Sequence, residues 1–299
     1  FITVGVVVIV VATFLRWVDL LSHLGRVPDA IDRAAAAAAR SLEDRRRAPW
    51  LGGRCAVDRS PADAARTEAA GSDAASPTVA VFGSEPGYLR HVDMSVLQQI
   101  AEENDCELQL EVLPGAFVDP SRALATIPAE LSRDCRDAIR DAFEIGVRRT
   151  FDLDPRYGVL TLAEIGTKAL SPGINDSGTA ISVIAALTRV LAIRAREEAK
   201  PEVSCSRVRV PSLRDEDLLE DAFATLARDG AGQVEICIRM QKALASLAGL
   251  GAPSLTRAAR IQSARALAHA RAALTLPEDI ERVTLLAEAV GARSPAGSA

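Results

Sequence analysis

Residues 168–180 read KALSPGINDSGTA, a polar corner that lies between two helical patterns. Pro172 and Gly173 end the first helix, because proline lacks an amide hydrogen and glycine readily adopts the backbone angles found just after a helix. Asp176 or Ser177 can cap the second helix, because either side-chain oxygen can accept a hydrogen bond from a free N–H of the first turn. We therefore expect a sharp elbow between two helices.

The helix after this elbow is expected over residues 177–199, and it is apolar on nearly every side. A helix that shows apolar residues all round is typical of a position in the centre of a bundle. Its apolar positions are Ile181, Val183, Ile184, Ala185, Ala186, Leu187, Val190, Leu191 and Ile193.

The composition argues against several classes of protein. The formal net charge is −5 and aromatic residues make up 4% of the 299 residues, which gives no basis for binding nucleic acid. The cysteines are too far apart for zinc or haem motifs, so we expect no metal, no cofactor and reduced thiols. They are Cys55, Cys106, Cys135, Cys205 and Cys237.

The first residues predict attachment to a membrane. Residues 1–15 are apolar except for Thr3, Gly5 and Thr13, although about 20 residues are needed to cross a bilayer. The chain opens on Phe1 rather than Met, so we expect residues 1–22 to be the end of a longer transmembrane helix, with Arg16 and Trp17 at its interfacial edge. A buried strand or helix of a soluble protein is the alternative.

Arginines follow the apolar segment and predict its orientation. Residues 23–47 are expected to form a juxtamembrane helix, and its arginines place it in the cytoplasm by the positive-inside rule. The strong preference for arginine over lysine, together with abundant alanine, indicates a GC-rich bacterial genome. We therefore expect the bacterial inner (plasma) membrane, the lipid bilayer as a partner, and residues after about 22 in the cytoplasm.

The remaining chain divides by its residue patterns, and the fold class is α+β, mainly α. Residues 48–77 are rich in proline, glycine and serine and predict a flexible linker. A small β-rich module is expected over 78–128, an α-helical domain over 129–292, and a disordered tail over 293–299.

The β-rich module is expected to hold strands at 79–82, 106–112, 117–118 and 124–127 and a helix at 93–103. It resembles half of a lipoyl-type barrel-sandwich hybrid, on residues 87–89, 110–118 and 124–127. No lysine precedes Lys168, so the lysine-linked swinging arm of such carriers is excluded.

The α-helical domain is expected to begin with a helix over 128–146, followed by a charged connector and a helix over 159–170. A loop over 201–211 contains a short strand at 207–210. Ser212 and Ser254 are expected to cap later helices, and residues 234–250 are taken as a helix although their first part alternates like a strand.

The chain resembles the predicted bacterial membrane proteins grouped as domain of unknown function 2254. The resemblance is carried by residues 87–118, 154–158 and 162–180, above all by the SPGIND block. It implies a bundle of membrane helices, of which the last is present here, and a cytoplasmic C-terminal region. Members typically have a proline and an aromatic residue where this chain has Ser177 and Gly178, which loosens the elbow.

The elbow is also the candidate ligand site. Free N–H groups at a helix N-terminus favour anions, and Lys168, Arg148 and Arg149 can add positive charge. The full candidate set is Lys168, Ser171, Gly173, Asn175, Asp176, Ser177, Thr179, Arg148 and Arg149. The alternative is structural, because Asn175 and Asp176 can satisfy the backbone of a sharp turn.

The sequence contains none of the common catalytic motifs, so an enzyme is less favoured than a non-enzymatic protein. Our first hypothesis is a membrane protein, expected to be a homo-oligomer, whose cytoplasmic region serves assembly or regulation of a membrane-embedded part such as a channel or transporter. The second is an enzyme or sensor that binds a small anionic ligand at the 171–179 helix N-terminus.

Overall fold

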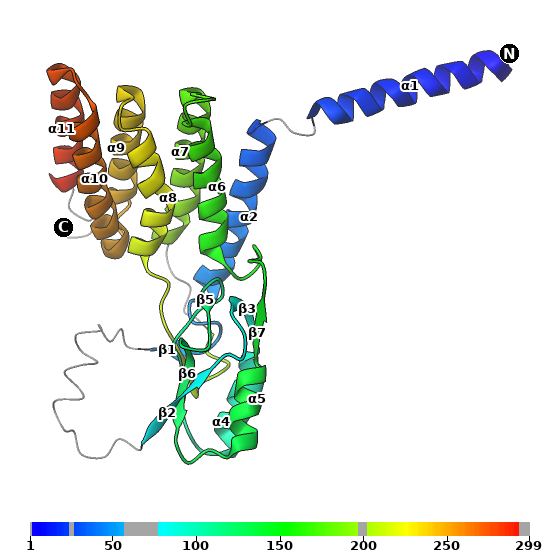
Figure 1. Cartoon of the computed structure of the whole chain (residues 1–299), viewed down its shortest axis with the longest axis vertical. Helices are drawn as coiled ribbons and strands as arrows, with labels where there is room; N and C mark the ends of the chain where they lie inside the picture. The colour runs from blue at the N-terminus through cyan, green and yellow to red at the C-terminus, as the bar shows by residue number, and fades with distance from the viewer. Residues whose placement is uncertain (1, 24–26, 57–76, 197–201, 293–299) are drawn as a thin grey trace.

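The computed structural model of the chain describes residues 2–23, 27–56, 77–196 and 202–292. A bundle of helices and a β-rich module lie end to end, and the first helix extends away from both (Figure 1). The fold class is α+β and mainly α, as predicted. Most of the predicted 48–77 linker and the 293–299 tail lie outside the described residues.

The bundle is built around one central helix, as the sequence predicted. Helix α7 packs against α2, α6, α8 and α9, and Val183, Leu187 and Leu191 are fully buried in the shared core. The helices of the bundle are α2 (Val27–Arg47), α6 (Pro155–Ala169), α7 (Ser177–Leu191), η1 (Ala192–Ala195), α8 (Asp215–Asp229), α9 (Val234–Ala248), α10 (Pro253–Ala273) and α11 (Pro277–Ala292).

Helix α1 (Ile2–His23) has the opposite character. Its large apolar side chains are 50–66% exposed, and they are Val4, Val6, Val7, Ile9, Val10, Val11, Phe14, Leu15 and Trp17. Within the described residues, Ser177–Ala195 is the stretch long and apolar enough to cross a membrane, while the apolar part of α1, Thr3–Trp17, is shorter. Ser177–Ala195 is apolar because it lies in the core of the bundle. No described contact buries the apolar side chains of α1.

The β-rich module contains two open sheets. The five-stranded sheet has the order β1-β8-β4-β6-β2, and the three-stranded sheet the order β5-β3-β7. The strands are β1 (Arg54–Cys55), β2 (Thr78–Phe82), β3 (Gly87–Val92), β4 (Leu108–Leu110), β5 (Phe117–Val118), β6 (Ala123–Pro128), β7 (Phe143–Gly146) and β8 (Val208–Val210). Helices α4 (Met94–Glu103) and α5 (Arg133–Asp141) complete its core. Neither sheet closes, so the resemblance to a barrel-sandwich hybrid does not extend to its architecture.

The boundary between the two modules differs from the one predicted from the sequence. The helix expected over 128–146 ends at Asp141, because Phe143–Gly146 forms β7 and pairs antiparallel with β3. Likewise, residues 48–56 are not linker: β1 pairs with β8, and the Trp50 indole donates to Ser212 Oγ at 3.2 Å. Both segments join the β module through pairing with strands far away in the sequence, which local patterns do not report.

Two predicted helix caps are also wrong. Ser212 accepts the bond from Trp50, and α8 starts after Arg214 without a side-chain cap. Ser254 lies inside α10 and donates to Asp215 Oδ2 at 2.6 Å. In both cases the serine hydroxyl that was expected to cap a helix forms a tertiary hydrogen bond instead.

Close packing of α2 against α6 predicts a measurable cost for one added methyl group. A Cβ at Gly158 would lie 2.6 Å from Ala38 Cβ and 2.7 Å from Ala38 Cα. We expect Gly158→Ala to lower the free energy of unfolding by about 1–3 kcal/mol, because the two helices must move apart. Urea unfolding followed by circular dichroism measures this change.

Gly173→Ala is the matched control, because a Cβ there meets nothing within 4 Å. It is expected to change the free energy of unfolding by less than about 0.5 kcal/mol. Equal stability of the two variants would show that the α2–α6 contact is looser than described.

Candidate functional site

The predicted elbow forms a tight, internally bonded turn. Helix α6 ends at Ala169, and Asp176 N donates to Ala169 O at 2.8 Å. Asp176 then caps α7 by accepting from Thr179 N at 3.0 Å and Thr179 Oγ1 at 2.6 Å. Asn175 adopts a positive φ of 48°, and its Oδ1 accepts from Gln233 Nε2 at 2.9 Å. Of the two predicted caps, Asp176 is therefore the one used, and Ser177 begins the helix.

The elbow offers little to an anion. The bonds from Thr179 lower the pKa of Asp176, so a carboxylate already occupies the start of α7. Lys168 and Ser171 line an open cavity of about 690 Å³ together with the acidic Glu164, Asp221 and Asp229. The local charge therefore does not favour an anionic ligand.

The structure does not bring Arg148 and Arg149 to the elbow. Arg149 bonds Asp154, the residue that caps the start of α6, whereas Lys168 lies in the last turn of the same helix. The 15 residues of α6 place these ends roughly 20 Å apart. Arg149 and Lys168 therefore lie at opposite ends of α6, and of these two cations only Lys168 lies next to the elbow.

A second polar site lies where the β module meets the bundle, and Asp154 is its centre. Asp154 is 3% exposed and accepts from Tyr157 N at 3.1 Å as the cap of α6. Arg149 donates two hydrogen bonds to the same carboxylate, of 2.6 Å and 3.0 Å. Such a two-bond pairing fixes both direction and distance.

Aromatic rings and a glycine complete this junction. The Arg149 guanidinium lies 5.2 Å from the ring centre of Tyr157 and 5.9 Å from that of Tyr88, so the cation contacts one ring from each module. Gly115 has a φ of +98°, and a Cβ there would overlap the Asp154 carboxyl group. The turn at Gly115 can therefore approach the bundle only because it carries no side chain.

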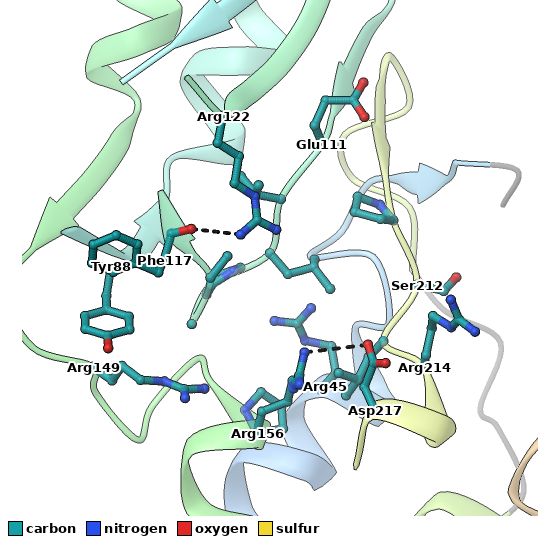
Figure 2. Close-up of a pocket in the computed structure, with 18 residues that line it drawn as sticks. Arg45, Tyr88, Glu111, Phe117, Arg122, Arg149, Arg156, Ser212, Arg214 and Asp217 are labelled. Atoms are coloured by element: carbon teal, nitrogen blue, oxygen red, sulfur yellow. Dashed lines mark hydrogen bonds and ion pairs between the residues drawn. The ribbon is translucent and has the colours of Figure 1, made fainter. Parts of the chain in front are cut away.

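A cavity of about 420 Å³ opens beside this junction. Five arginine side chains line it, and they come from different parts of the chain: Arg45, Arg122, Arg149, Arg156 and Arg214. Figure 2 shows Arg122, Arg149 and Arg45 reaching toward it from different directions. We call this cavity the arginine pocket.

Arg45 forms part of the pocket lining although it is only 4% exposed. Its Nη2 donates to Leu153 O at 3.1 Å, while its Nη1 has no hydrogen-bond partner among the described residues. Burial lowers the pKa of Arg45 to about 10, partly offset by Asp154. The guanidinium thus stays charged near neutral pH with part of its donor capacity unused.

Arg156 is the best-paired cation of the pocket. It holds Asp221 with two bonds, of 2.6 Å and 3.0 Å, and lies 3.6 Å from Asp217. The hydrogen bonds that Arg156 donates to Asp221 raise the pKa of Arg156. Arg156 and Arg149 are therefore held rigidly by carboxylates, whereas Arg122 bonds a backbone oxygen, Phe117 O, at 2.8 Å.

Two sequence blocks that carried the family resemblance meet in this pocket. Tyr88 and residues 113–117 line it from the β module, and Pro155 and Arg156 line it from the bundle. Sequence reasoning included Arg149 but missed Arg45, Arg122, Arg156 and Arg214 as a group. The two sequence blocks were the signal that could have pointed to this pocket. No pattern of neighbouring residues indicates that the two blocks meet in the fold.

Comparison with known proteins agrees with this resemblance. Residues 1–246 match the family described as predicted membrane protein DUF2254. The chain belongs to the DUF2254 family. Similar proteins include the uncharacterized proteins Mb1321c of Mycobacterium bovis and Rv1290c of Mycobacterium tuberculosis.

Each of these two relatives is 30% identical to this chain over 126 residues, which cover 39% of the chain and 24% of the relative. The match therefore spans about a quarter of the relatives' length. No solved structure matches the chain.

Other chemistry is sparse in the described part of this DUF2254 chain. No group of three or more His, Cys, Asp or Glu side chains there is placed to hold a metal ion. The five cysteines are free thiols, of which Cys205 and Cys237 are buried. Burial raises the pKa of Cys237 to about 11, so its thiol is a poor nucleophile at neutral pH.

Because the buried Asp154 carboxylate is bonded on both oxygens, a small substitution there should have a large effect on stability. Asp154→Asn keeps the shape and the capping oxygen but removes the charge that Arg149 and Arg45 face. We expect the free energy of unfolding to fall by about 1.5–3 kcal/mol, the usual worth of a hydrogen bond to a charged group. Thermal and urea unfolding measure this loss.

Asp152→Asn serves as the control, because Asp152 is exposed only two positions away. It is expected to leave stability nearly unchanged. If both variants lost equal stability, the junction would not depend on the Asp154 charge.

Proposed function

We propose that this DUF2254 protein is attached to the bacterial inner membrane through α1, and that its folded part lies in the cytoplasm. We further propose that this part serves assembly or regulation of a membrane-embedded portion, such as a channel or transporter, and works as a homo-oligomer. The observation that carries the proposal is the exposed apolar surface of α1, which contacts nothing in the described structure.

The geometry of the bundle supports this role. Helix α1 leads into α2 at the end of the bundle that is far from the β module (Figure 1). The elbow lies at the same end, and its Ile174 is 52% exposed, as is Leu276 in the turn between α10 and α11. Exposed apolar tips at the end nearest α1 suit contact with lipid or with a membrane-embedded partner.

The arginines after α1 support the cytoplasmic orientation. Arg33 and Arg40 are exposed on α2, within the distance over which basic residues favour the cytoplasmic side. The chain's mild net charge of −5 argues against a competing role in binding nucleic acid.

Charges placed on α1 should release the protein from membranes. The double substitution Val7→Glu, Val10→Glu puts two carboxylates into the apolar stretch, each at a cost of roughly 2.5–3.5 kcal/mol if that stretch lies in lipid. We expect the wild-type chain to stay in the membrane fraction after a carbonate wash and the double variant to move to the soluble fraction.

Val147→Glu is the control, because Val147 is 90% exposed in the folded part and should not affect partitioning. A wild-type chain found in the soluble fraction would contradict attachment through α1. Reporter proteins fused after Ala299 test the orientation: a cytoplasmic reporter is expected to be active and a periplasmic one inactive.

Reconstitution into liposomes tests the regulatory role. We expect solute release after osmotic shock to exceed that of protein-free vesicles and to change with Ile174→Glu at the elbow, whose side chain lies at the end nearest α1. Val147→Glu, in the opposite part of the molecule, should behave as wild type. Permeability equal to that of protein-free vesicles under all conditions would contradict the channel or transporter version.

A further inference from the structure

We propose that the arginine pocket binds a soluble small molecule that carries a phosphate group. The inference goes beyond the proposed function, because binding at this pocket does not require that α1 enter a membrane. It rests on an unsatisfied buried arginine, on the charge of the lining, and on the place of the pocket in the fold.

The first argument is the state of Arg45. A buried cation normally has its donors paired, because an unpaired buried polar group costs free energy. Arg45 is 4% exposed, its one described bond goes to a neutral carbonyl, and its Nη1 has no partner. An anion in the adjoining pocket would compensate this charge, after a small rotation of the side chain that exposes Nη1.

The second argument is the charge of the lining. Five arginines face two acids, Glu111 and Asp217. Glu111 already accepts from Thr126 Oγ1 at 2.7 Å, and Asp217 lies 3.6 Å from Arg156. The backing carboxylates of Asp154 and Asp221 pair with Arg149 and Arg156, which leaves Arg45 and Arg122 with backbone carbonyls as their described partners.

The direction of the arginines favours phosphate over carboxylate. Arg45 belongs to the end of α2, Arg122 lies between β5 and β6, and Arg149 precedes α6, so their guanidinium groups approach the pocket from different directions (Figure 2). A tetrahedral phosphate presents three terminal oxygens in three directions, whereas a carboxylate presents two in one plane. Arginine forks match phosphate oxygens well.

The remaining lining admits more than a bare ion. The volume of about 420 Å³ lies within the range typical of small-molecule sites. Tyr88 and Phe117 pack edge to face with their ring centres 5.2 Å apart and form an apolar border beside the arginines. A phosphate on a small organic group fits this combination.

The place of the pocket favours a soluble ligand over a lipid headgroup. Arg45 lies in the last turn of α2, and α1 precedes the first turn. The 21 residues of α2 separate these ends by roughly 30 Å. A headgroup at the level of α1 would not reach the pocket, whereas a metabolite in solution would.

Occupancy would join the two modules. The lining comes from α2, α6 and α8 of the bundle and from β3 and β5 of the β module. A phosphate held between them would tighten their contact and act directly on the end of α2, the helix that leads back to α1. Where the proposed membrane role holds, the ligand is its regulator.

Isothermal titration calorimetry on the full chain in detergent micelles tests the proposal. The probes are inorganic phosphate and glycerol 3-phosphate, with sodium chloride at equal ionic strength as the reference. We expect both phosphates to bind, and Arg45→Met and Arg122→Gln each to weaken binding at least tenfold. Arg133→Gln, whose side chain is 94% exposed elsewhere on the β module, should bind as wild type.

Stability separates a ligand role of Arg45 from a packing role. Because the burial of the Arg45 charge outweighs its attraction to Asp154, the melting temperature of Arg45→Met should be equal to or above that of the wild type. A lower melting temperature with unchanged phosphate affinity would show that Arg45 serves packing and would overturn the assignment. Should Arg45→Met fail to fold, the exposed Arg122→Gln decides the outcome alone.

Two further probes distinguish the source and the chemistry of the ligand. Binding of short-chain phosphatidate without binding of glycerol 3-phosphate would assign the pocket to lipid and overturn the soluble ligand. Equal affinity for succinate would overturn the preference for phosphate. No binding of any probe above the salt reference would overturn the site, while the carbonate-wash result for α1 would stand independently.

Discussion

The pairing of the buried Asp154 carboxylate with Arg149 fixes the contact between the bundle and the β module. Asp154 starts α6, fixes Arg149, and lies against the turn at Gly115 of the other module. A charge that is 3% exposed is tolerated only when it is fully bonded. The two modules therefore meet in a defined orientation, and the shape of the adjoining pocket follows from that orientation.

The parts of the fold that local chemistry decides were predictable. The apolar pattern after the elbow predicted a central helix over 177–199, which the structure has as Ser177–Leu191, and Asp176 caps it as expected. The same reasoning failed for Phe143–Gly146, where apolar spacing suited a helix but pairing with β3 makes a strand. Very short strands such as β1 owe their structure to a partner more than 150 positions away, so no window of neighbouring residues reveals them.

The candidate site shows the same division. The elbow was recognisable because its proline, its glycines and its capping aspartate lie within a few residues of one another, and the structure accounts for it as a turn. The arginine pocket was not recognisable, because Arg45, Arg122 and Arg214 are separated by long stretches and each looks like an ordinary solvated cation. Only the packing of α2 into the bundle shows that Arg45 is buried. Arg149 was predicted to add positive charge at the elbow, whereas it pairs with Asp154 at the opposite end of α6.

The position of β8 has a consequence for how the chain is made. Strand β8 lies between β1 and β4 and pairs parallel with both, so the larger sheet lacks the strand that joins β1 to β4 until residue 210 has left the ribosome. At elongation rates of about 5–20 residues per second, the hundred residues after β4 take roughly 5–20 s to synthesise. During that interval the edge of β4 offers free backbone groups to any neighbouring nascent strand. Because β8 completes this sheet late, β4 is more exposed to pairing with a wrong strand during synthesis than in the finished fold.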